Sequence, residues 1–174
     1  MPMRRVFFAL PPAVALQRAF VRLADEVALA AQGRVPQADS IHMTLAFIGD
    51  IAVERIGELV ALGATVSARR FALSLDRVGS FRRARVAWVA PAAVAPALVM
   101  LQHALAGALA HAGFRTEARP FAPHVTLARH CTRAIEARQI DCAVQWPVTQ
   151  FALWASSTAP HGARYDEIAR WALA

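Results

Sequence analysis

The chain carries two copies of a short motif in which a threonine follows a histidine by two residues. The first copy, His-Met-Thr-Leu, covers His42–Leu45, and the second, His-Val-Thr-Leu, covers His124–Leu127. The two histidines lie 82 positions apart, about half of the 174-residue chain. One copy alone is typical of a structural histidine on a strand, but two copies in matching contexts favour shared chemistry.

A strand would give both motifs a chemical meaning, because successive side chains of a strand point to opposite faces. His42 and Thr44 would share one face, as would His124 and Thr126, while the alternate residues anchor each strand in the core. Two such pairs across a cleft suit in-line cleavage of a phosphodiester. One imidazole removes a proton from water and the other protonates the departing oxygen. The hydroxyls can hold the phosphate oxygens, where negative charge accumulates.

The first half of the chain predicts two strands and two helices that position the first motif. An apolar stretch that ends at Pro11 and Pro12 predicts a strand. Apolar residues at helical spacing over residues 16–27 predict an amphipathic helix. Residues 41–48 suit the first motif strand, and residues 53–68 suit a shorter helix.

The second half of the chain is richer in strands. A third helix is expected from Pro96 to just before Gly113, and a loop is expected at residues 79–83. Residues 131–141 show no clear pattern. Strands are expected at residues 71–78, 86–89, 124–129, 148–156 and 165–173.

The composition describes one folded domain with excess positive charge. The length fits a single domain, and 57% hydrophobic residues exclude disorder caused by low hydrophobicity. No apolar run reaches the ~18 residues of a membrane span. The net charge is +7 and every basic side chain is arginine, whose planar fork suits phosphate. Biased codon usage explains the arginines equally well, so both readings stay open.

The cysteines and the N-terminus favour a cytoplasmic protein. Cys131 and Cys142 match no zinc or redox spacing, so we expect a reducing compartment. The apolar run after Arg4 and Arg5 reaches only five residues before Pro11. A signal-peptide core needs about 7–15 apolar residues, so we interpret this run as a strand.

Longer blocks of sequence surround the two motifs and carry a family resemblance. The blocks are Arg5–Leu10, His42–Gly49, Gly79–Phe81, Arg85–Trp88, Arg119–Arg129 and Gly162–Tyr165, with Trp171 near the end. Together they resemble the two-histidine phosphoesterase superfamily, and within it the bacterial and archaeal RNA 2′,3′-cyclic phosphodiesterases, also known as 2′-5′ RNA ligases. The resemblance extends over nearly the whole chain, and its most specific block ends at Arg129.

The resemblance implies an α+β fold in which residues 1–174 form one two-lobed domain. Each pseudo-symmetric lobe would be an antiparallel sheet with helices packed outside, and the active-site groove would lie between the lobes. The implied enzyme uses no metal or cofactor. It would open 2′,3′-cyclic phosphate RNA ends to 2′-phosphates, so that the 3′ oxygen leaves. We expect a monomer without a membrane partner.

The resemblance also assigns roles to six residues. His42 and His124 become the acid–base pair, while Thr44 and Thr126 bind phosphate. Our interpretation is that His124 activates water and His42 protonates the leaving group, although a pseudo-symmetric site can run either way.

Two further positions follow the motifs. Arg129 would contact phosphate or stack on a base, and Phe47, the analogous residue in the first half, would stack on a base or pack in the core. Strict alternation from His124 places Arg129 on the opposite face, so its role requires a β-bulge or a strand end.

Other sites and functions compete with this hypothesis. Zinc takes three or four ligands from Cys, His, Asp or Glu, whereas these motifs supply threonine, so we disfavour a metal site. No catalytic role is expected for the remaining histidines, which are His103, His111, His130 and His161.

Two functional alternatives remain. A reversible 2′-5′ RNA ligase acting on tRNA halves would use the same residues in reverse, and sequence does not separate the two. A non-catalytic RNA- or nucleotide-binding module would track phosphates with arginines instead. Its surface would comprise Arg69, Arg70, Arg82, Arg83, Arg85 and Arg115. Two intact His–Thr pairs favour the enzyme over the binding module.

Overall fold

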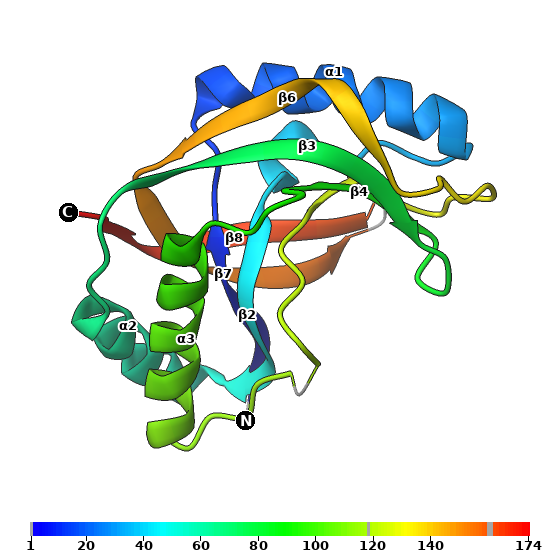
Figure 1. Ribbon diagram of the computed structural model, residues 1–174. Helices are drawn as coiled ribbons and strands as arrows, with labels where there is room; N and C mark the ends of the chain where they lie inside the picture. Colours follow the sequence, from blue (N-terminus) through cyan, green and yellow to red (C-terminus); the bar gives the residue numbers. More distant parts are fainter. Residues whose placement is uncertain (1, 118, 160–161) are drawn as a thin grey trace.

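Eight strands and three α-helices are the main elements of the part of the chain described by the computed structural model, which covers residues 2–117, 119–159 and 162–174. Figure 1 shows their arrangement. In chain order the elements are β1 (Met3–Leu10), α1 (Val14–Ala31), β2 (Met43–Ala52), α2 (Ile56–Thr65), β3 (Phe71–Phe81), β4 (Val86–Ala90), α3 (Pro96–His111), β5 (Val125–Ala128), β6 (Arg138–Val148), β7 (Gln150–Ala159) and β8 (Gly162–Ala172).

The strands form one antiparallel sheet in the order β6-β3-β4-β5-β2-β1-β7-β8. The sheet divides into two four-stranded halves that meet where β2 pairs with β5. A single residue pair, Met43 with Val125, makes that junction. The predicted α+β fold with two antiparallel lobes is therefore confirmed, and the two lobes share a continuous sheet.

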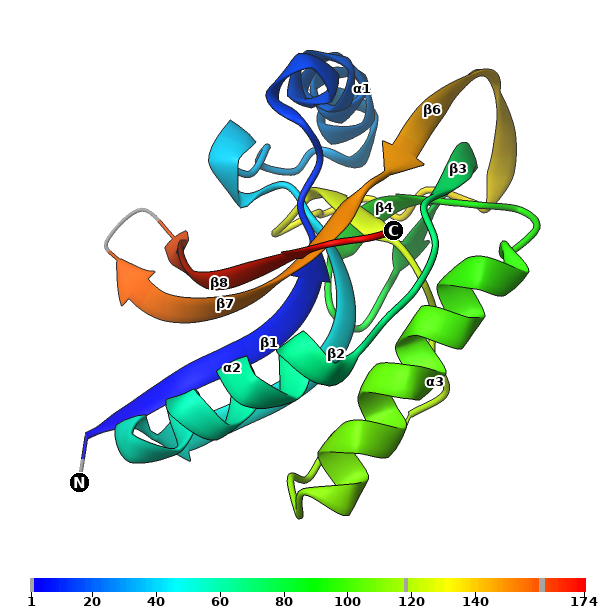
Figure 2. The same ribbon diagram turned by 90° about the vertical axis from the view of Figure 1, so that its left-hand side faces the viewer.

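One helix from each half of the chain packs against the opposite half of the sheet. Helix α1 follows β1 but contacts β4, β5 and β6, whereas α3 follows β4 but contacts β2. Figures 1 and 2 show α1 at one end of the molecule and α2 with α3 at the other. Each motif strand is thus backed by a helix from the other half, and the order strand–helix–motif strand occurs twice.

Helix α3 shows why the predicted helices form. Pro96 occupies the first turn, where its missing N–H costs nothing. Gly113 adopts a φ of +73° just beyond the helix end, a conformation that glycine reaches without strain. The apolar face is completely buried and comprises Leu98, Leu101, Leu105 and Leu109. None of the helices in the described ranges has the length and apolar character needed to span a bilayer.

Two expectations about the strands were wrong or incomplete. Residues 79–81 belong to β3 and not to a loop, because they pair with β4; only residues 82–85 form the turn. The unassigned region contains the start of β6, whose buried residues are Val144, Trp146 and Val148. Their period of two is a strand signal, but the polar residues before them obscured it.

A glycine contact on β3 yields a stability prediction. Gly79 pairs with Trp88, and a Cβ atom at position 79 would lie 2.5 Å from the Trp88 ring. Gly79→Ala should therefore lower the free energy of unfolding by about 1–3 kcal/mol, since overpacking forces the indole to move. Chemical denaturation measures this change.

Gly107→Ala is the matched control. Gly107 lies inside α3, and no neighbouring group comes within 4 Å of the place that an alanine Cβ atom would occupy. Alanine should therefore stabilise the protein by about 0.5–1 kcal/mol through its higher helix propensity. Equal effects of the two substitutions would contradict the close packing of Trp88 on β3.

Candidate active site

The junction between β2 and β5 brings the two motifs together. Met43 faces Val125 in an antiparallel pair, and each motif histidine lies one residue before its partner in that pair. Continuing the register by one residue sets His42 across from Thr126 and Thr44 across from His124. Both predicted His–Thr pairs therefore occupy one side of the same strand junction.

The residues that alternate with these pairs anchor the junction, as predicted. Met43, Leu45, Val125 and Leu127 are at most 2% exposed and belong to the main hydrophobic core. The histidines and threonines of both motifs are only half-buried. The core side of β2 and β5 is thus apolar, and the opposite side carries the polar groups.

A β-bulge turns Arg129 toward the second motif's histidine. The pairing of β5 with β4 skips Leu127, so Leu127 and Ala128 are both buried in succession. Arg129 then returns to the face of His124, and its backbone forms an isolated bridge with Arg34. The bulge that the sequence interpretation required is present, and β5 also ends at this point.

A β-bulge also interrupts the strand of the first motif. The pairing of β2 with β1 skips Leu45, so Leu45 and Ala46 are both buried. Phe47 consequently reaches the face of His42 and is 39% exposed. Of its two expected placements, core packing is wrong. Phe47 and Arg129 occupy equivalent positions in the two halves.

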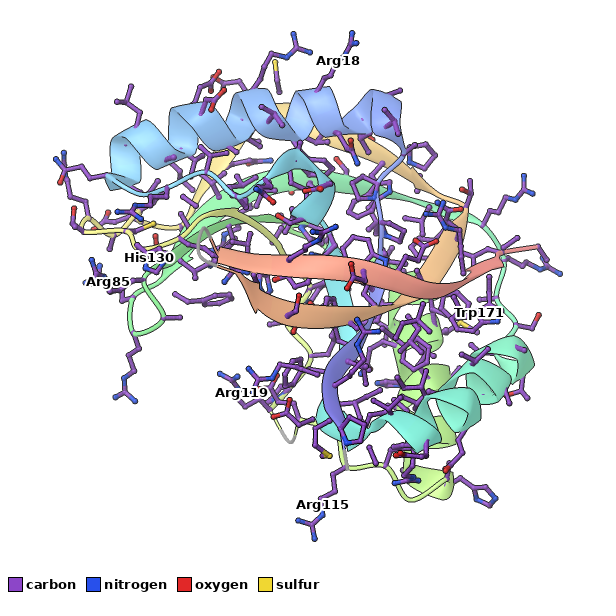
Figure 3. All side chains as sticks on the ribbon, turned by 180° about the vertical axis from the view of Figure 1, so that it is seen from behind. Arg18, Arg85, Arg115, Arg119, His130 and Trp171 are labelled. Carbon is purple, nitrogen blue, oxygen red and sulfur yellow. The ribbon has the colours of Figure 1, made fainter. Side chains whose placement is uncertain are left out.

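A single pocket of about 610 Å³ contains all six predicted site residues. It extends from the motif strands to α3 and to the segment between α3 and β5. Its other polar or aromatic lining residues are Phe81, Arg83, Gln102, Thr116, Glu117, Arg119 and Phe121. Glu117 forms an ion pair with Arg119, a residue labelled in Figure 3. Of these additional residues, the sequence interpretation gave a role only to Arg83, as part of the surface of the alternative RNA-binding module.

Backbone carbonyls fix the protonation pattern of both imidazoles. Nδ1 of His42 lies 2.7 Å from the Ser40 carbonyl oxygen, and Nδ1 of His124 lies 2.7 Å from that of Ala122. A carbonyl only accepts hydrogen bonds, so each Nδ1 carries a proton. In the neutral rings, Nε2 therefore keeps its lone pair. The Thr44 hydroxyl, 3.2 Å away, can donate to Nε2 of His42.

Aromatic rings enclose His42. Phe7, Trp154 and Tyr165 place their ring centroids 5.0, 5.2 and 5.1 Å from the imidazole. Phe7 and Trp154 are buried in a small second cluster on this side of the sheet. The sequence interpretation missed this enclosure. Phe7 and Tyr165 lie in family-like blocks and Trp154 does not, but no local signal connects Trp154 or Tyr165 to the motif.

His124 has a more open environment with one aromatic neighbour. Phe81 meets its ring nearly edge to face, with centroids 4.8 Å apart. Trp88 packs behind Phe81, and Gly79 leaves room for Trp88. Among the described residues, Nε2 of His124 has no hydrogen-bond partner, so its lone pair is available to a ligand.

Both histidines have depressed pKa values. Burial lowers the pKa of His42 to about 4, and the positive charges of Arg129 and His124 act in the same direction. Burial also lowers the pKa of His124, again assisted by Arg129. Their hydrogen bonds to Ser40 and Ala122 oppose these shifts without cancelling them. At neutral pH both imidazoles are therefore uncharged, beside the guanidinium of Arg129.

The remaining histidines are not part of this site as the structure describes it. His103, His111 and His130 do not line the pocket, and His161 lies outside the described residues. Across the described ranges, no three His, Cys, Asp or Glu side chains come together as a metal-binding group. Arg69, Arg70, Arg82, Arg85 and Arg115 do not line this pocket either, whereas Arg83 does.

Comparison with known proteins identifies the family. The family model of the 2′-5′ RNA ligase superfamily matches residues 11–159. The chain is 36% identical over 141 residues to an RNA 2′,3′-cyclic phosphodiesterase of Escherichia coli K12, and the match covers 81% of this chain and 80% of the relative. It is 29% identical over 142 residues to a Thermus thermophilus protein of the same name, with coverage of 76% and 72%. The chain belongs to the 2′-5′ RNA ligase superfamily, as the resemblance predicted.

Solved structures support the same assignment. E. coli LigT in complex with 3′-AMP superimposes with a TM-score of 0.88 at 31% identity, and the match covers 99% of each chain. The same protein without ligand gives the same TM-score, identity and coverage. The fold and the family are therefore established over nearly the whole chain.

The depressed pKa of His42 predicts a loss of stability in acid. A histidine whose folded-state pKa lies below its unfolded value of 6.5 binds protons more readily when unfolded. Its stabilising contribution is complete above pH 6.5 and is lost as the pH falls toward 4. The free energy of unfolding should drop by roughly 2–3 kcal/mol more in the wild type than in His42→Gln between pH 7 and pH 4. Urea denaturation of both proteins between pH 7 and pH 4 measures this drop. A difference in the free energy of unfolding that stays the same across this range would contradict a neutral His42 imidazole in the folded protein.

Proposed function

We propose that the chain is an RNA 2′,3′-cyclic phosphodiesterase that forms 2′-phosphate ends without a metal. The observation that carries this proposal is the placement of two Nδ1-protonated imidazoles and Arg129 in one pocket. The curated relatives named RNA 2′,3′-cyclic phosphodiesterase support the substrate class. Residues 1–174 would act as one two-lobed domain, because each half contributes one His–Thr pair.

The proposed reaction is an in-line hydrolysis. One histidine accepts a proton from water through Nε2, and the resulting hydroxide attacks the phosphorus atom. The bond from phosphorus to the 3′ oxygen breaks, and the second histidine delivers a proton to that oxygen. The products are a free 3′-hydroxyl and a 2′-phosphate, and one water molecule is consumed. General acid–base catalysis of this kind contributes about 10²–10⁴-fold per positioned group.

We assign the base role to His124 and the acid role to His42. The lone pair on Nε2 of His124 has no partner among the described residues, whereas Nε2 of His42 lies beside Thr44. His42 is neutral at pH 7 because its pKa is about 4. An anionic phosphate would raise that pKa and so charge His42 when substrate binds.

The remaining predicted residues hold the substrate. Thr44 and Thr126 donate hydroxyl hydrogen bonds to the non-bridging oxygens, and the Arg129 guanidinium neutralises the charge that grows on them. Phe47 offers an exposed ring at the pocket wall on which a base can stack.

The same groups suit a reversible 2′-5′ RNA ligase, the activity for which the matching family is named. If the 5′-hydroxyl of a second RNA end replaces water, attack on the cyclic phosphate forms a 2′-5′ bond. Ends of cleaved tRNA are candidate substrates. The proportion of joined to hydrolysed ends, measured with both RNA ends present, ranks this activity against hydrolysis.

Removal of either motif histidine should abolish turnover. In His42→Ala and His124→Ala, kcat for an oligonucleotide with a 2′,3′-cyclic phosphate should fall at least about 100-fold, because each variant lacks one proton carrier. Chromatographic separation of cyclic and opened ends measures the rate. Near-normal turnover in both variants would refute the assignment.

Three controls sharpen this experiment. His103→Ala, on the exposed side of α3, should leave kcat unchanged. Full turnover in a chelator supports metal-free catalysis, and loss that zinc restores contradicts it. A nucleoside p-nitrophenyl phosphodiester has a leaving group that needs no protonation, so His42→Ala should retain much of its activity on this ester. Retention by His124→Ala instead would reverse the acid and base roles.

A further inference from the structure

A second pocket, of about 390 Å³, adjoins the candidate active site and has a basic lining. Two chain segments form it: the end of β3 with the turn into β4, and the segment that follows β5. Three arginines line it, namely Arg82, Arg85 and Arg133, together with the hydroxyl side chains of Ser80 and Thr132. Its floor includes the buried side chains of Val86 and Cys131.

The second pocket and the candidate active site share part of their lining. Phe81 and Val86 line both cavities, and Phe81 also contacts His124. Neighbouring arginines of the β3–β4 turn divide between them, since Arg82 lines the second pocket and Arg83 lines the active site. Phe81 and Val86 therefore stand between the two cavities.

The charge of the second pocket is not neutralised by the protein. Within the described ranges, Arg82, Arg85 and Arg133 form no ion pair, in contrast to arginines such as Arg55, which pairs with Glu58, and Arg170, which pairs with Glu167. All three arginines are exposed. A patch of this kind attracts a polyanion, and guanidinium groups bind phosphate oxygens with two hydrogen bonds.

Arg85 is held in place by the segment that follows β5. It adopts a φ of 55°, and its Nε and Nη2 donate to the carbonyl oxygens of Cys131 and His130 at 3.0 and 3.3 Å. Figure 3 shows Arg85 and His130 close together. These bonds use two of its five N–H donors and join the two segments that form the pocket. The second pocket therefore has a fixed frame, with Arg82 and Arg133 on its rim free to contact a ligand.

We propose that this pocket binds the phosphate on the 5′ side of the terminal nucleoside, and so makes the enzyme prefer an RNA chain to a cyclic mononucleotide. The inference rests on the proposed function, since it assumes that the cyclic phosphate lies between His42 and His124. With its base on Phe47, the terminal nucleoside then extends toward Phe81, and the next phosphate meets Arg82 and Arg133. The other polar groups of this pocket, the hydroxyls of Ser80 and Thr132, are uncharged, so they do not repel the negative charge of a phosphodiester.

A series of three substrates tests this subsite. The first is adenosine 2′,3′-cyclic phosphate, the second carries an added 5′-phosphate, and the third is the dinucleotide ApA with a 2′,3′-cyclic end. In the wild type, kcat/KM should rise by about 5- to 50-fold from the first substrate to the other two. A charge-assisted hydrogen bond at an exposed site contributes a gain of this size. Arg82→Gln and Arg133→Gln should lose most of that gain and turn over the first substrate at the wild-type rate.

Arg18→Gln is the matched control, because Arg18 lies on α1, as Figure 3 shows, and lines neither pocket. This variant should keep the full gain. No gain in the wild type, or a gain that survives in the double variant Arg82→Gln/Arg133→Gln, would overturn the subsite.

A binding measurement separates the subsite from the proposed function. Fluorescence anisotropy of a labelled RNA with a 2′-phosphate end reports affinity without turnover. In the double variant, the slope of log affinity against log salt should become less steep by about 0.7 for each lost phosphate contact. If the wild type hydrolyses no cyclic substrate, the proposed function fails, and equal RNA affinities of the wild type and the double variant would then overturn the subsite as well.

Discussion

The pairing of Met43 with Val125 is the interaction on which the site depends. It joins the two halves of the sheet and fixes the register of both motif strands at once. Because side chains alternate, burial of these two residues forces His42 and His124 to the opposite face. A slip of one residue would turn both histidines into the core and both apolar residues into the pocket. The geometry of the candidate site is therefore set by the same apolar packing that holds the halves together.

The helices reinforce this junction by crossing between the halves. Helix α1 backs β5 and α3 backs β2, so neither motif strand is supported only by its own half. Around that frame, the bulges at Leu45 and Leu127 add a third functional position to each motif. One half supplies an aromatic ring at this position, and the other supplies a guanidinium. The fold is thus approximately symmetric but the site is not, because aromatic rings enclose His42 whereas His124 is more open.

Much of this arrangement could be predicted from the sequence because it is encoded locally. Alternation within each motif predicted the faces of His42 and Thr44, and the leucines of α3 predicted its buried side. Other features depend on residues that meet only after folding. Trp154 and Tyr165 reach His42 from strands more than a hundred residues away, and the β-bulge before Arg129 arises from pairing with β4. Strand β6 was obscured because only its last part alternates in burial.

Nitrogen-15 NMR of the histidine side chains tests the central claim most directly, namely that two imidazoles act through Nε2 on one phosphate. In the free protein at pH 7, both rings should be neutral with the proton on Nδ1, because the carbonyls of Ser40 and Ala122 accept from that atom. Addition of adenosine 2′-phosphate should shift the Nε2 resonances of both rings and raise both pKa values. A free-state proton on Nε2, or a response confined to one ring, would contradict a phosphate site shared by His42 and His124.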